Sequence, residues 1–237
     1  MAYAFAARQT ASGIRYSDVI VNPTHWNAWR GRELDLLAAL SEGFDEAAQD
    51  GLCETGIAYS LLRSQTAREA EDIVAALTYQ RPERVVALSV DGDEERDDTL
   101  GTLGVWDAID LLRAERIDHG VRSIEDPALI ERLVRDEISL GVCPRSNVSL
   151  GIYPDWASHP LPRLLDAGVR VTLNTDDPVP LGTTLEADWA VAAAQFGFTE
   201  ADLAGFARRS IEASFAPDDL KRDLLAELDA LEVASAS

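Results

Sequence analysis

Short apolar runs alternate along this chain with longer amphipathic segments, and the alternation predicts its secondary structure. Repeated strand–helix units indicate a parallel sheet and an α/β fold, because two parallel strands need a crossover connection between them. Strands are predicted at residues 14–21, 56–62, 84–90, 116–119, 138–143 and 169–174. Helices are predicted at 2–12, 32–50, 66–80, 104–114 and 160–167, after the capping pair Asp126–Pro127, and about three times beyond residue 183.

Composition narrows the class of protein. Of 237 residues, 42 are acidic and 21 are basic, and the net charge of −21 disfavours nucleic acid and anionic membranes as partners. Two cysteines, Cys53 and Cys143, argue against a disulfide scaffold. No apolar run approaches the roughly 20 residues of a membrane span, and no basic segment precedes a long apolar one at the N-terminus. We therefore expect a cytoplasmic protein.

The predicted strand ends carry the candidate chemistry, since reactive side chains of α/β barrels come from the carboxyl ends of strands. His119 precedes Gly120, which allows a sharp turn there. By itself, a lone histidine is more often structural than functional. Asp176 and Asp177 are adjacent carboxylates after a buried strand, and their repulsion would be relieved by a cation or by hydrogen-bond donors. A turn that caps the next helix explains them equally well.

Three segments taken together resemble one family. Arg-Ile-Asp-His-Gly at 116–120, Cys-Pro-Arg-Ser-Asn at 143–147 and Asn-Thr-Asp-Asp-Pro at 174–178, in this order and spacing, closely resemble the adenosine deaminase family of zinc aminohydrolases. Further similarity lies at 13–21, 63–94 and 210–215. The resemblance implies one (β/α)8 barrel domain over residues 1–237. Its second to fourth strand units would occupy 1–94, its sixth to eighth 104–182, and C-terminal helices 183–237.

The resemblance also implies roles for particular residues. Asp176 matches a zinc ligand that contacts the metal-bound water, and His119 matches the histidine that positions this water. Asp177 and Gly92 match groups that bind the purine, Gly92 through its backbone N–H. The implied reaction is zinc-dependent hydrolytic deamination of adenosine, or of a related aminopurine such as adenine, to inosine or its counterpart and ammonia. The expected partner is a small purine nucleoside.

Two motifs of the family are missing from this chain. It contains neither the His-x-His of the first strand nor the His-Ala-Gly-Glu of the fifth, which matches a strand count of six where a barrel has eight. Its remaining histidines, His25 and His159, are predicted to be structural. Three hypotheses follow: an active deaminase, a truncated remnant that binds purine weakly or not at all, and a subunit completed by another chain through unpaired strand edges.

Overall fold

The computed structural model describes residues 1–23, 26–62, 64–91 and 102–235. They form two compact units, one of residues 1–93 with 214–220 and one of residues 94–213 with 221–237. The predicted single barrel domain stays a prediction. Among the described residues, the strands are β1 (Tyr16–Val21), β2 (Glu54–Leu62), β3 (Val85–Asp91), β4 (Arg116–Asp118), β5 (Ser139–Val142) and β6 (Val171–Leu173). The α-helices are α1 (Ala2–Ala11), α2 (Glu33–Gln49), α3 (Ala67–Gln80), α4 (Thr102–Asp110), α5 (Pro127–Arg135), α6 (Pro144–Ser149), α7 (Leu161–Asp166), α8 (Leu185–Phe196), α9 (Glu200–Ala213) and α10 (Asp218–Ser235).

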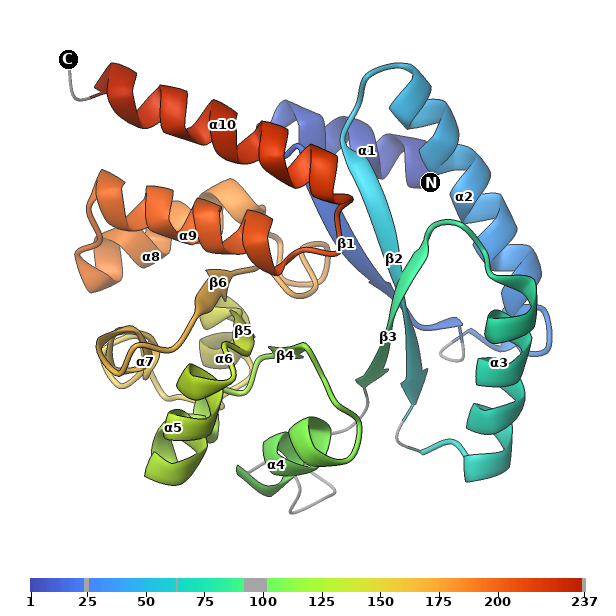
Figure 1. The fold of residues 1–237 in the computed structure, drawn as a ribbon, viewed down its shortest axis with the longest axis horizontal. Coiled ribbons are helices and arrows are strands. Elements are labelled where there is room, and N and C mark those ends of the chain that lie inside the picture. Colours follow the sequence, from blue (N-terminus) through green and yellow to red (C-terminus); the bar gives the residue numbers. More distant parts are fainter. Residues whose placement is uncertain (24–25, 63, 92–101, 236–237) are drawn as a thin grey trace. The chain divides into compact units, whose positions relative to one another are not determined.

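The first unit is a parallel sheet in the order β1-β2-β3, with a helix in each connection (Figure 1). Apolar side chains of α1, α2 and α3 pack with those of the strands in one cluster, and Leu37, Ile57 and Tyr59 at its centre are fully buried. Helix α3 begins where the sequence predicts, because Thr66 and Glu69 form a reciprocal capping box. Local capping and burial of the apolar stripe thus fix this helix.

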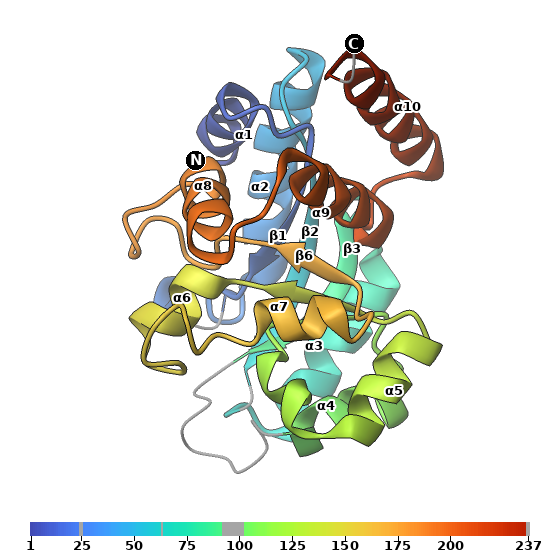
Figure 2. The same ribbon diagram turned by 90° about the vertical axis from the view of Figure 1, so that its left-hand side faces the viewer.

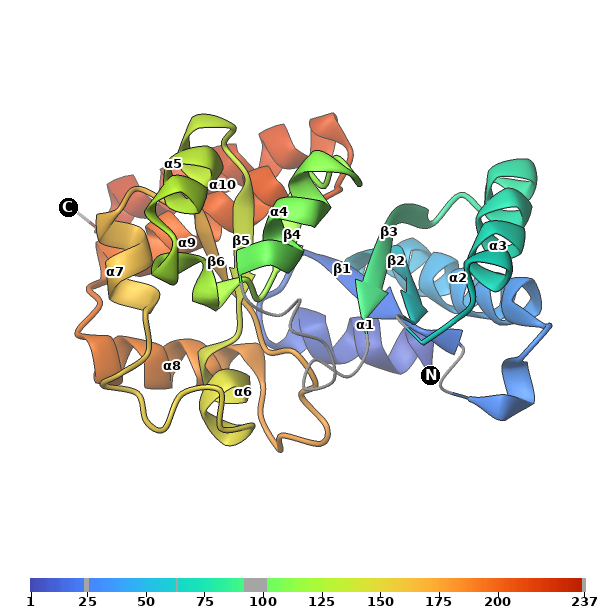
Figure 3. The same cartoon turned by 90° about the horizontal axis from the view of Figure 1, so that it is seen from below.

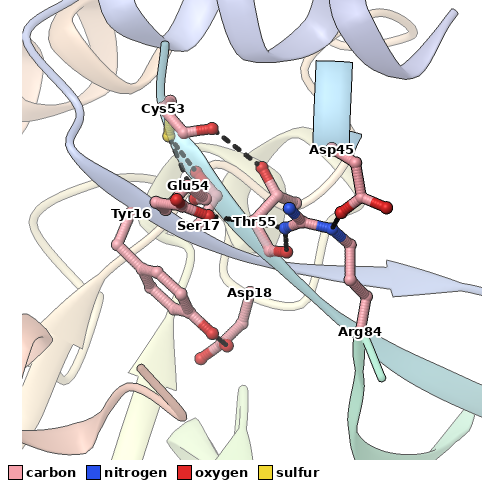
Figure 4. A network of polar contacts seen from close by, with 8 residues as sticks. All are labelled: Tyr16, Ser17, Asp18, Asp45, Cys53, Glu54, Thr55 and Arg84. Atoms are coloured by element: carbon pink, nitrogen blue, oxygen red, sulfur yellow. Dashed lines mark hydrogen bonds and ion pairs between the residues drawn. The ribbon is translucent and has the colours of Figure 1, made fainter. Parts of the chain in front are cut away.

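A polar network ties α2, β2 and the start of β3 together (Figure 4). The guanidinium of Arg84 donates to the Asp45 carboxylate at 2.6 Å and to the backbone carbonyl of Thr55 at 2.8 Å. It also lies 3.4 Å from a carboxylate oxygen of Glu54. The Arg84 side chain is 16% exposed, so these bonds satisfy a largely buried cation.

The hydroxyl group of Tyr59 has an unusual place in this unit. It is buried and has no hydrogen-bond partner among the described residues, and burial raises its pKa to about 12. An unsatisfied buried hydroxyl carries a desolvation cost of roughly 1–3 kcal/mol. We therefore expect Tyr59→Phe to leave the free energy of unfolding unchanged or to raise it by about 1 kcal/mol, as measured by urea denaturation.

Tyr16→Phe is the matched control, because the Tyr16 hydroxyl donates to Asp18 at 3.0 Å. Loss of that bond should lower the free energy of unfolding by about 1 kcal/mol. A loss of 1 kcal/mol or more in the Tyr59 variant would mean that its hydroxyl has a partner in solution.

The second unit holds another parallel sheet, in the order β4-β5-β6 (Figure 1). Its last strand, β6, contacts α9, and Figure 2 shows the two close together. Its core joins the strands to α4, α5, α7, α8 and α9, with Leu129, Leu140 and Phe206 fully buried. The predicted start of α5 is confirmed: the Asp126 carboxylate accepts from the N–H groups of Ala128 and Leu129. Strands β4 and β6 have three residues each, which places the following side chains directly at the strand ends.

The sequence-based elements agree with the structure apart from two corrections. Helix α4 ends at Asp110 rather than at residue 114, because the chain turns there and Arg113 adopts a left-handed backbone. Helix α6 was not predicted, since six residues opened by Pro144 are too short to show a helical period. Within the described ranges, no helix has the length and apolarity required to cross a lipid bilayer.

Candidate functional site

The site lies at the carboxyl ends of β4, β5 and β6, in the second unit. The N–H of His119 donates to the carbonyl of Gly141 at 2.8 Å, and the N–H of Asn174 donates to the carbonyl of Val142 at 2.9 Å. These bonds extend the strand ladders by one residue beyond β4 and β6. The three segments that carry the family-like motifs therefore end side by side at one edge of the sheet.

His119 and Asp176 come together at this edge. Nε2 of His119 lies 3.9 Å from Oδ2 of Asp176, and the two side chains are 30% and 28% exposed. Both residues also have a left-handed backbone, with φ of 67° and 63°. The other non-glycine residues with positive φ, Arg81, Arg113 and Glu137, follow helices, where this conformation is a common cap.

Directly after a strand, a left-handed non-glycine residue is strained, and such strain concentrates at functional sites. Here His119 follows β4 directly, and Asp176 lies three residues beyond the end of β6. The two residues that the sequence predicts to be catalytic therefore share an uncommon backbone conformation at this edge of the sheet.

Ser146 orients the aspartate. Its side chain is fully buried, and its hydroxyl donates to Oδ2 of Asp176 at 2.6 Å. No hydrogen bond from the described residues reaches Oδ1 of Asp176, so this oxygen could accept from a ligand or a water molecule. Sequence analysis selected the 143–147 segment but assigned Ser146 no role. The only available signal was its position, just beyond a predicted strand end.

The floor of the site is polar and closely packed. A methyl group on Gly141 would collide with Oδ1 of Asp118 and would lie 3.3 Å from the amide nitrogen of Asn174. Below the rim, the Cys143 thiol is buried, and its pKa is raised well above the ordinary value by desolvation and by the carboxylates of Asp176 and Asp118. These surroundings favour the protonated form of the thiol.

The other predicted site residues are placed differently. Asp177 is exposed next to Asp176, and its carbonyl accepts from the N–H of Leu181 in the turn after β6. Gly92 and His25 lie outside the described residues. The roles predicted for His119, Asp176, Asp177 and Gly92 remain predictions.

His159 is structural, as the sequence predicts. Its ring is 3% exposed and contacts the rings of Tyr153 and Phe196. Nδ1 accepts from the N–H of Leu161 at 3.1 Å, and Nε2 lies 3.1 Å from Oδ1 of the Asn147 side chain. Desolvation lowers the pKa of the ring from 6.5 to about 4, so the buried ring is neutral at neutral pH and both nitrogens have polar partners.

The described residues do not fit a zinc ion by themselves. A catalytic zinc normally has three protein ligands, whereas no group of three metal-ligating side chains occurs in the described part of the chain. At the rim, Asp176 and His119 are the two donors that meet, and one oxygen of Asp176 already accepts from Ser146.

Comparison with known proteins identifies the family. The model of the adenosine deaminase family matches residues 97–231, which is more than half of the chain. An adenine deaminase from Cupriavidus pinatubonensis is 35% identical over an alignment that covers 95% of this chain and 71% of that protein. An adenine deaminase from Cupriavidus necator is 51% identical over 125 residues, which are 53% of this chain and 36% of that protein.

Solved structures agree on the fold. The adenine deaminase of Arthrobacter aurescens superposes with a TM-score of 0.89 over 97% of this chain and 77% of its own, at 26% identity. An amidohydrolase from Burkholderia ambifaria, solved with bound zinc, gives 0.88 over 99% and 74%, also at 26% identity. These comparisons define a hydrolase of the TIM-barrel class, with six strands among the described residues of this chain. The chain belongs to the adenosine deaminase family, whose members hydrolyse C–N bonds.

The alignments also bear on the missing motifs. The alignment with the Cupriavidus pinatubonensis protein is 251 positions long, which exceeds the 237 residues of this chain. The relative therefore has residues inside the aligned stretch that have no counterpart here. An internal loss agrees with the absent fifth-strand motif.

Proposed function

We propose that the rim formed by His119, Ser146, Asp176 and Asp177 binds an aminopurine, and that the reaction of the protein is hydrolytic removal of its exocyclic amino group. The observation that carries this proposal is the convergence of His119 and Asp176, which follow the two outer strands β4 and β6 of the sheet and both have a left-handed backbone. Adenine is favoured over adenosine as the substrate, because the relatives named above are adenine deaminases.

The rim supplies groups that such a hydrolysis needs. The attacking water must lose a proton, and negative charge develops on its oxygen. Asp176, held through Oδ2 by Ser146, would accept a hydrogen bond from this water through Oδ1. His119, at 3.9 Å from the carboxylate, would orient the water and stabilise the developing charge. The exposed carboxylate of Asp177 would accept a hydrogen bond from the purine ring.

Zinc is the cofactor that the family implies, and Asp176 is its predicted ligand here. The two rim donors are fewer than a catalytic zinc requires, so turnover needs ligands beyond those of the described residues. That shortfall favours a second candidate function, which is purine binding without turnover.

One experiment separates the two candidates. Purified protein, supplied with one equivalent of zinc, is incubated with adenine or adenosine, and hypoxanthine or inosine is quantified by chromatography. Metal content and adenine affinity are measured on the same sample. The proposed reaction predicts stoichiometric zinc and faster turnover of adenine than of adenosine. Adenine binding without zinc or product would establish the second candidate, and the absence of both binding and turnover would refute both.

A further inference from the structure

A single buried carboxylate connects two segments of the candidate site. Asp188 lies in the first turn of α8 and is 4% exposed. Its Oδ1 accepts from the hydroxyl of Thr183 at 2.7 Å and forms a short ion pair with Nε of Arg145. Helices α6 and α8 are in contact, and Figure 3 shows them near each other in the second unit.

Each hydrogen-bond partner of Asp188 is connected to Asp176 through a neighbouring residue or turn. Arg145 immediately precedes Ser146, whose hydroxyl holds Oδ2 of Asp176. Thr183 closes the turn that follows Asp176, because its N–H donates to the carbonyl of Pro178 at 3.0 Å. One carboxylate thus fixes both the serine that orients Asp176 and the loop that carries it.

The burial of this network makes it sensitive to small changes. Oδ2 of Asp188 is buried and has no hydrogen-bond partner in the described part of the chain, so the charge depends on the two donors to Oδ1. A buried charge that loses its partner is strongly destabilised, and buried networks act as units rather than as sums of pairs. Asp188 is therefore a strong constraint on the position of both segments.

We propose that Asp188 is a positioning residue, which acts through Arg145 and Thr183 to hold Ser146 and the loop of Asp176 in their working arrangement. The expected effect of Asp188 on adenine turnover rests on the proposed function. The expected effect on the position of residues 176–183 does not depend on that function.

Amide hydrogen exchange tests the geometric part. In Asp188→Asn, exchange across residues 176–183 should become at least about tenfold faster, as expected when a charged hydrogen-bonded pair is weakened. Glu186→Gln is the control, since it removes the same charge from an exposed position on the same helix. Thr183→Val removes one donor with little change of shape and should also accelerate exchange in 176–183.

An unchanged rate of amide exchange in residues 176–183 of both Asp188→Asn and Thr183→Val would overturn the proposal. The proposal would also fail if exchange in β4, β5 and β6 became faster by the same factor as in 176–183. If Asp188→Asn does not fold, Thr183→Val alone decides.

A double-mutant cycle tests the functional part. Asp188→Asn should lower kcat for adenine about tenfold or more with little change in KM, and the loss should be much smaller in a Ser146→Ala background. Additive effects would show that Asp188 does not act through Ser146. If the unaltered protein neither binds nor converts adenine, the proposed function fails, and the exchange experiment still decides the positioning role.

Discussion

Replacing Asp176 with asparagine should lower the rate of adenine deamination by roughly 10²–10⁴-fold, the range typical for loss of an acid–base group. The amide keeps the shape of the side chain and the oxygen that accepts from Ser146, but it cannot take a proton from water. Adenine affinity should change less than about tenfold, because Asp176 is expected to contact the water rather than the purine. Steady-state kinetics and calorimetric binding measure the two effects.

Two variants make this prediction specific. Asp177→Asn should raise KM for adenine more than it lowers kcat, because Asp177 is expected to bind the ring. Asp166→Asn, an exposed carboxylate of the same unit, should change neither quantity. An Asp176 variant with normal turnover would exclude Asp176 from the chemistry, and a purely KM effect would exchange the roles of the two aspartates.

The second large effect is a dependence of stability on pH that arises at His159. The pKa of this ring is about 4 in the folded protein and 6.5 as an ordinary value. Above pH 6.5 the ring is neutral in both states, and its contribution to stability is fully present. As the pH falls from 6.5 to about 4, the unfolded chain binds a proton that the folded protein does not. The free energy of unfolding should then fall by about 3 kcal/mol in total.

Urea denaturation at several pH values between 4 and 7 measures this loss. His159→Gln should remove most of the dependence in that range, because glutamine does not titrate, although it should also lower stability at neutral pH by disturbing the bonds to Asn147 and Leu161. His119→Gln is the control and should leave most of the dependence in place, because it leaves the His159 ring and its bonds to Asn147 and Leu161 unchanged. The same pH dependence in the His159 variant as in the unaltered protein would refute this assignment.

Much of the fold was determined by the sequence alone. Apolar periodicity placed the six strands within a few residues, and local signals set helix starts, such as Thr66 before α3 and Asp126 before α5. These features depend on neighbours a few positions apart, which a linear pattern records. Three motifs, read together, gave the family and located His119 and Asp176 at strand ends.

Other parts of the site were decided only by the tertiary structure. The bond from Ser146 to Asp176 joins residues 30 positions apart, and the pair of Arg145 with Asp188 joins residues 43 apart. No local period encodes such contacts, because they form only when parallel strands bring separate segments to one edge. The left-handed backbones of His119 and Asp176 have the same origin, since packing around the strand ends holds conformations that local preference disfavours.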